Sequence, residues 1–116
     1  MEESAQDSAV QFVAINYITC SSEYAARFEH LFRTRAHAID RVPGFCGMKV
    51  LKPSKGAEPY LIVSHWTSEE AFKNWLDSPE FLEGHIRGFE DLKEAKLKGE
   101  KPPMTSKFVT YSVLTD

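Results

Sequence analysis

The sequence predicts an α+β protein of the ferredoxin-like type, with strands and helices in the order β-α-β-β-α-β. Short stretches rich in β-branched and aromatic residues alternate with longer stretches in which apolar residues recur at helical spacing. The two β stretches in the middle of the chain are separated only by the turn-like sequence SKGAEP. This order is typical of a four-stranded antiparallel sheet that carries helices on one face.

The composition is that of one globular domain and disfavours two classes of partner. Of the 116 residues, 42% are hydrophobic and 27% are charged, as in ordinary folded domains. The 14 basic and 17 acidic residues are intermixed, so no nucleic-acid partner is expected. No apolar run approaches the roughly 18 residues of a membrane-spanning helix, so no membrane partner is expected either. Residues 1–10 are polar and acidic, which predicts a flexible tail followed by a single domain over 11–116.

The two cysteines carry no motif. Cys20 and Cys46 form neither a CxxC pair nor the spacing of a zinc site. We expect both to be reduced thiols of a cytoplasmic protein.

The first strand and first helix are expected within residues 11–41. Residues 11–20, QFVAINYITC, predict a strand that is apolar on both faces and therefore central. Residues 23–41 predict a single long helix, which Pro43-Gly44 ends. Its apolar stripe comprises Tyr24, Phe28, Leu31, Phe32, Ile39 and Val42.

The next three elements are two strands and a capped helix. Residues 46–52 and 60–66 predict strands that form a hairpin. Thr67, with Glu70 three positions later, forms a capping-box pattern at the start of a helix that includes Trp75.

A break at Ser78-Pro79 separates that helix from another. Ser78 is expected to cap the new helix and Pro79 to occupy its first turn. The apolar face of this helix carries Phe81, His85, Phe89 and Leu92. Residues 108–115 then predict the last strand.

The predicted sheet is apolar on both faces, although helices cover only one. An apolar face of that size is seldom left in water. Pairing of two such sheets about a two-fold axis would bury it, so a homodimer is expected.

The chain contains no P-loop, dinucleotide fingerprint, GxSxG or HExxH motif. Chemistry would therefore depend on an imported cofactor or a reactive substrate. Of the four histidines, His30 and His37 are expected to be exposed, and His65 to be buried and hydrogen-bonded in a central strand. Spacing alone favours a core histidine over a ligand for His85.

Two further residues are unusual for their positions. Asn16 interrupts an apolar central strand. Either a neighbouring loop satisfies the hydrogen bonds of its amide, or the amide is a hydrogen-bond donor held inside a pocket. Trp75 lies on an apolar helix face, where an indole is usually plain core.

Together these residues resemble the IsdG-type heme-degrading monooxygenases, part of the antibiotic biosynthesis monooxygenase group of dimeric α+β barrels. The resemblance covers nearly the whole chain and includes RAHAIDRVPGF at 35–45 and LKPSKGAEPYLIVSHWTSEEAFKNW at 51–75. Its most specific part is the trio of an asparagine in the first strand, a tryptophan that ends the second helix and a histidine further on. Those positions hold Asn16, Trp75 and His85.

The resemblance implies a function and a set of roles. Heme would be both substrate and cofactor, with O₂ and an external electron donor, either a separate reductase or a small reductant. His85 would be the axial ligand of the heme iron, Asn16 a hydrogen-bond donor to the oxygen, and Trp75 the residue that ruffles the porphyrin.

Other residues could also meet the heme. Phe32 could line the pocket, although core packing explains it equally well. Arg33 or Arg35 could pair with the propionates, and a solvated helix face explains either one equally well.

Two other functions are compatible with the same features. One is a cofactor-free monooxygenase that acts on quinol-like aromatic compounds and needs no iron ligand. The other is a non-catalytic heme carrier or sensor, which would bind heme through His85 without consuming it.

Overall fold

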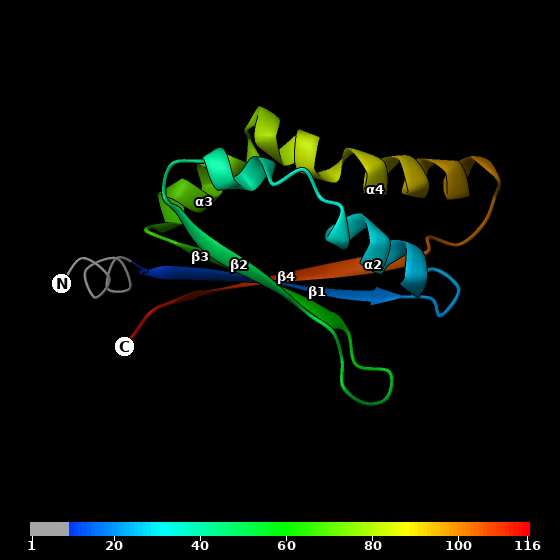
Figure 1. Cartoon of the computed structure of the whole chain (residues 1–116), viewed down its shortest axis with the longest axis horizontal. Helices are drawn as coiled ribbons and strands as arrows, with labels where there is room; N and C mark the ends of the chain where they lie inside the picture. Colours follow the sequence, from blue (N-terminus) through cyan, green and yellow to red (C-terminus); the bar gives the residue numbers. More distant parts are fainter. Residues whose placement is uncertain (1–9) are drawn as a thin grey trace.

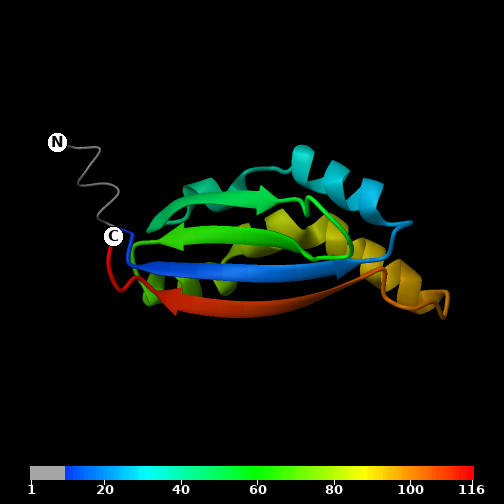
Figure 2. The same cartoon turned by 90° about the horizontal axis from the view of Figure 1, so that it is seen from below.

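The computed structural model describes residues 10–116, so the predicted tail lies, up to residue 9, outside the described residues. Four strands form one sheet in the order β2-β3-β1-β4, and neighbouring strands are antiparallel. The helices lie on one face of this sheet (Figure 1, Figure 2), so the ferredoxin-like prediction is confirmed. In chain order the elements are β1 (Phe12–Cys20), α2 (Ala25–Arg33), the 3₁₀ helix η1 (Ala38–Arg41), β2 (Phe45–Leu51), β3 (Tyr60–Trp66), α3 (Glu69–Leu76), α4 (Pro79–Leu97) and β4 (Met104–Ser112).

β1 is a central strand, as predicted, and alternate residues point to opposite faces of the sheet. The even-numbered residues 12–18 are buried toward the helices. Asn16 is one of them, and it lies between Ile62 of β3 and Phe108 of β4. The sheet register thus places a carboxamide beneath the helices.

The other face of the sheet has no helix over it in the described part of the chain (Figure 1). It carries half-buried apolar side chains, among them Val13, Ile15 and Val63, together with the exposed Tyr111. The model contains one chain, so the homodimer remains a prediction.

The long helix predicted over 23–41 is wrong. α2 ends at Arg33, residues 34–37 are irregular, and η1 follows. The predicted apolar stripe is divided between two clusters, since Phe28 packs with Ile18 and Tyr60, whereas Ile39 packs around Trp66. A straight helix could not supply both clusters, and the chain leaves helical geometry between them.

Two element boundaries also differ from the prediction. Ser68, rather than Thr67, caps α3, because the Ser68 hydroxyl accepts the amide of Ala71 at 3.0 Å. β4 begins at Met104 instead of residue 108. After Met104, residues 105–107 are exposed and polar, which an edge strand tolerates and an apolar-pattern search overlooks.

The break between α3 and α4 is confirmed. The Ser78 hydroxyl accepts the Phe81 amide at 3.2 Å and donates to the Trp75 carbonyl at 2.6 Å. Pro79 occupies the first turn of α4, where a missing amide hydrogen costs nothing. One side chain therefore connects the end of the Trp75 helix to the start of the His85 helix.

One end of the core is built from aromatic rings around Trp66. Its indole is fully buried and lies edge-on to Phe45 and Phe72, with ring centroids 5.4 and 5.7 Å away. Trp75 joins the same cluster, 5.6 Å from Trp66. Rigid packing of this kind fixes α3, and with it the position of the Trp75 indole.

Within residues 10–116, no helix is both long and apolar enough to cross a membrane.

Candidate functional site

A cavity lies between the sheet and the helices. Its empty volume, including the space at its open mouth, is about 1050 Å³. The walls are contributed by all four strands, α2, residues 35–37, η1, α3 and α4. Of the six residues that the sequence suggested for a site, all but Arg33 line this cavity, namely Asn16, Phe32, Arg35, Trp75 and His85.

His85 projects from α4 with one ring nitrogen engaged. Its Nδ1 lies 2.6 Å from the carbonyl oxygen of Phe81. A carbonyl oxygen only accepts, so Nδ1 carries the proton and the neutral ring keeps a free lone pair on Nε2. Burial lowers the pKa of His85, and the hydrogen bond to the Phe81 carbonyl offsets this only in part. The ring is therefore held neutral, in the form that can ligate a metal through Nε2.

Aromatic rings hold the His85 imidazole in place. Phe81 stacks on it with a centroid distance of 4.1 Å, and Phe89 lies nearly parallel at 5.5 Å. Trp75 is 5.7 Å away, in a tilted arrangement. The sequence left open which group would orient His85, and the structure identifies it as a carbonyl one turn earlier in the same helix.

Trp75 and Asn16 share an uncommon property. Among residues 10–116, the indole Nε1 of Trp75 and the side-chain oxygen of Asn16 are the buried side-chain nitrogen and oxygen atoms without a hydrogen-bond partner. Trp75 is 7% exposed and Asn16 is 8% exposed. A buried polar atom that lacks a partner costs about 1–3 kcal/mol. Within residues 10–116, neither a neighbouring loop nor core packing satisfies these two atoms, although both residues line the cavity.

Ser64 provides a contrast within the same cavity. It is also buried, but its hydroxyl accepts the indole Nε1–H of Trp66 at 2.9 Å and lies 3.4 Å from the Ala14 carbonyl. Its polar atom is therefore satisfied by the protein itself. Among residues 10–116, the buried side-chain atoms without a partner are thus confined to Asn16 and Trp75.

The two candidate arginines are distinguished by position. Arg33 is exposed and pairs with Glu29 at 3.1 Å, outside the cavity lining. Arg35 is half-buried and lines the cavity, and no acidic side chain of residues 10–116 pairs with it. Arg35 is thus the cation available to an anionic group in the cavity.

Phe32 is half-buried beside Phe28, with ring centroids 5.0 Å apart. It contributes apolar surface both to the core and to the cavity wall.

The remaining histidines lie away from the centre of the site. His30 and His37 are exposed, as predicted, and His37 reaches the rim of the cavity. His65 is half-buried rather than buried, so that prediction is wrong. Its neighbours Ser64 and Trp66 are buried toward the helices, and the pleat therefore turns His65 to the opposite face.

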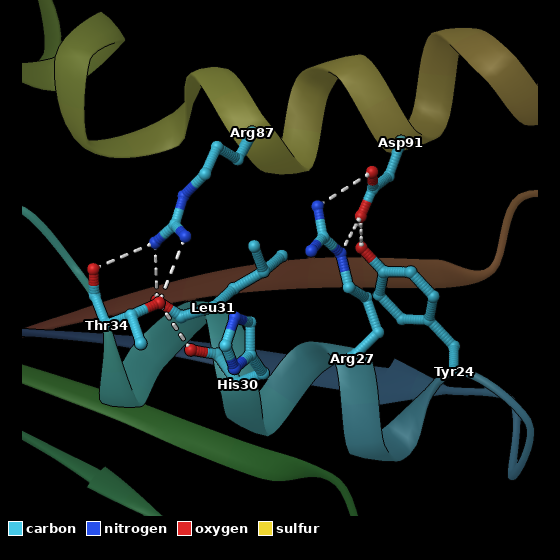
Figure 3. Close-up of polar contacts among 7 residues, drawn as sticks. All are labelled: Tyr24, Arg27, His30, Leu31, Thr34, Arg87 and Asp91. Atoms are coloured by element: carbon cyan, nitrogen blue, oxygen red, sulfur yellow. Dashed lines mark hydrogen bonds and ion pairs between the residues drawn. The ribbon is translucent and has the colours of Figure 1, made fainter.

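Arg87 is a lining residue that the sequence did not suggest. Its guanidinium reaches across from α4 to the end of α2, where it contacts Leu31 and Thr34 (Figure 3). The Leu31 and Thr34 carbonyls are free to accept from Arg87 because α2 ends at Arg33. In the long helix predicted from the sequence, these carbonyls would have accepted hydrogen bonds within the helix.

Comparisons with known proteins agree on one family. Residues 11–87 match the family model described as antibiotic biosynthesis monooxygenase. A heme oxygenase (mycobilin-producing) of Mycobacterium tuberculosis is 43% identical over 67 residues, which are 58% of this chain and 64% of that relative, just under two thirds of its length. A heme oxygenase (staphylobilin-producing) of Staphylococcus epidermidis is 31% identical over 106 residues, 90% of this chain and 94% of the relative.

Solved structures give the same fold with two different chemistries. The heme-degrader MhuD of Mycobacterium tuberculosis, with two hemes bound in its active site, has a TM-score of 0.65 and 32% identity over 90% of this chain and 97% of that chain. SnoaB, a cofactor-independent oxygenase of Streptomyces nogalater, also has a TM-score of 0.65, with 22% identity over 92% of this chain and 96% of that chain. At that identity the second likeness shows the fold alone.

Proposed function

Because the chain belongs to the antibiotic biosynthesis monooxygenase family, we propose that it is a heme-degrading monooxygenase. It would bind heme in the cavity and cleave the porphyrin ring with O₂ and electrons from an external donor, releasing the iron. The observation that carries this proposal is the convergence of three unused groups on one largely apolar cavity. They are the Nε2 lone pair of His85 and the unpartnered polar atoms of Asn16 and Trp75.

His85 is proposed as the only protein ligand of the heme iron. Its neutral ring and free Nε2 suit this role, and the Phe81 carbonyl fixes the orientation of the ring. Held by this one histidine, the heme would supply the activation of O₂ when bound.

Asn16 and Trp75 are proposed to act on the oxygen-binding side. The side-chain nitrogen of Asn16 can donate a hydrogen bond, whereas its buried side-chain oxygen, which can only accept, has no protein partner among residues 10–116. Trp75 is held by Trp66 and by the edge-on ring of Phe81, 4.9 Å away. A rigid indole in this position can press on a flat substrate and distort it, whereas a mobile side chain would yield.

The rim of the cavity suits the polar end of heme. Arg35 is proposed to pair with a propionate, because it lines the cavity without an acidic partner. Phe32 is proposed to contact the porphyrin face. Electrons are proposed to come from a separate reductase or a small reductant of the cytoplasm, where Cys20 and Cys46 would remain free thiols.

The function is tested by adding hemin to the purified protein, then ascorbate in air, with catalase present to remove free peroxide. We expect the Soret band of bound hemin to decay while iron is released, and Asn16→Ala and Trp75→Ala to slow this decay. A stable Soret band after reduction in air would indicate a heme carrier. Failure to bind hemin would instead favour a cofactor-independent oxygenase, the chemistry of the SnoaB relative.

A further inference from the structure

Side chains of α4 hold both ends of α2 (Figure 3). Near the start of α2, Asp91 accepts hydrogen bonds from Tyr24 at 2.6 Å and from Arg27 at 2.9 Å. At the end of α2, the Arg87 guanidinium donates to the carbonyls of Leu31 and Thr34, at 3.0 and 3.1 Å. We refer to the second set of contacts as the Arg87 clasp.

The Arg87 clasp takes the place of a helix cap. The last carbonyls of a helix have no partner within the helix and attract cations. Arg87 supplies a cation there, and it also donates to the Thr34 hydroxyl at 3.0 Å. A planar guanidinium can reach several acceptors at once, which fixes the direction in which the chain leaves α2.

The segment that leaves α2 forms part of the cavity wall. Residues 35–37 all line the cavity, and His37 has a φ of 60°, the only positive φ of a non-glycine residue within 10–116. Such a conformation persists only when the surroundings hold it. The middle of α2 is fixed separately, because Tyr60 donates to Glu29 at 2.6 Å and Phe28 is buried. Residues 34–37 are therefore held at one end by the buried Ala38 and Ile39 and at the other by the contacts at the end of α2.

We propose that Arg87 is a positioning residue of the site. Its guanidinium fixes segment 34–37 against α4, so that Arg35 faces the same cavity as His85. Arg87 lies two positions after His85 on α4 and itself lines the cavity, so one side chain connects the wall that carries the iron ligand to the wall that carries the propionate partner. The proposal rests on the proposed heme site, and it assigns Arg87 an effect that acts through Arg35.

The first arm of the test needs no heme. The amides of Thr34 and Arg35 are hydrogen-bonded to His30 and Phe32, so their hydrogen exchange reports the order of this segment. In the apoprotein, Arg87→Gln should accelerate exchange of these two amides by about tenfold or more, since it removes a charged donor from two carbonyls. Arg41→Gln is the matched control, because it breaks a different arginine contact to α4, the ion pair Arg41–Glu83 at 2.7 Å, outside the cavity lining. It should leave both amides unchanged.

The second arm measures dissociation of hemin into excess apomyoglobin. Arg87→Gln and Arg35→Gln should each accelerate dissociation by about tenfold, the value of one charge-assisted contact. If Arg87 acts through Arg35, the double variant should dissociate no faster than Arg35→Gln alone. If the two factors multiply instead, Arg87 has a separate structural role and the inference is overturned.

If Arg87→Gln fails to fold, the conservative variant Arg87→Lys replaces it in both arms of the test. An ammonium group reaches fewer acceptors than a guanidinium, so Arg87→Lys should give intermediate exchange and dissociation rates. Rates equal to those of the wild type would overturn the inference. Wild-type protein that binds no hemin would refute the proposed function, while the exchange arm would still test whether Arg87 orders residues 34–37.

Discussion

At the scale of single residues, the site is defined by polar atoms that the protein leaves unused. The Phe81 carbonyl occupies one nitrogen of His85 and leaves the other free, and nothing in residues 10–116 pairs with the buried polar atoms of Asn16 and Trp75. Buried polar groups are nearly always hydrogen-bonded. Two exceptions line one cavity, and we propose that their cost in stability serves binding.

The stability cost of the unpartnered amide can be measured at Asn16. Asn16→Leu replaces the carboxamide with an apolar side chain of similar shape, so it removes a buried group without a partner and keeps the volume. We expect the free energy of unfolding of the apoprotein to rise by about 1 kcal/mol in urea denaturation, while hemin degradation is lost. Ser64→Ala is the control, since it leaves the Trp66 indole unpaired and should destabilise. A less stable Asn16→Leu apoprotein would mean that the amide is satisfied in solution.

Trp75 should matter for its shape more than for its nitrogen. Trp75→Phe keeps a ring in the aromatic cage and should retain partial degradation of hemin. Trp75→Ala should stop degradation, although hemin still binds through His85, and should cost about 3–5 kcal/mol of stability. The proton spectrum of the cyanide-bound form reports porphyrin ruffling through its meso shifts. Activity and spectra are measured at a temperature where both variants are folded. Unchanged shifts and full turnover in Trp75→Ala would mean that the indole only packs in the core.

At the scale of elements, the short break between α3 and α4 sets the geometry of the site. Ser78 links the Trp75 carbonyl to the start of α4, and Ser68 caps α3 by a similar bond at its other end. Ser78→Ala and Ser68→Ala should therefore each cost about 1 kcal/mol in thermal or urea unfolding.

Only Ser78→Ala should also alter the bound heme, because Ser78 lies between Trp75 and His85. The ruffling-sensitive proton shifts should move in Ser78→Ala and stay unchanged in Ser68→Ala. Equal spectra would show that aromatic packing alone fixes the angle between the two helices.

The elements also show where sequence patterns suffice and where they do not. Ser78-Pro79 predicted the helix break correctly, because the effects of a proline and of a capping serine on a helix are local. The end of α2 at Arg33 was not predictable in this way, because it depends on how Phe28 and Ile39 divide between two clusters far apart on the sheet. Spacing along the chain shows that residues share a stripe but not that one helix carries it throughout.

At the scale of the whole molecule, the sheet has one covered face and one open face. Half-buried apolar residues such as Val63 occupy the open face at its centre. We propose that a second copy of the chain covers it, and we expect sedimentation of the wild type to give a dimer at micromolar concentration. Val63→Asp should give a monomer, because a carboxylate would be buried without a partner. Leu82→Asp, at an exposed apolar position of α4, should remain dimeric. A stable wild-type monomer would contradict the proposal.

The candidate site was predictable in its residues but not in its contacts. Asn16, Trp75 and His85 stand out as a polar residue in an apolar strand, an indole and an imidazole on apolar helix faces, and the resemblance joined them. The Phe81 carbonyl, the Arg87 clasp and the choice of Arg35 over Arg33 all depend on the placement of segments distant in sequence. No local pattern encodes such contacts.

The central claim is that this cavity binds heme through Nε2 of His85, and the most direct test is the ligation spectrum of the hemin complex. Wild-type protein should bind about one hemin per chain and, when reduced under argon, give the iron–histidine stretching band of a five-coordinate heme in resonance Raman spectra. His85→Ala should lose that band, and His65→Ala, on the opposite face of the sheet, should keep it. An unchanged band in His85→Ala, or none in the wild type, would contradict the account.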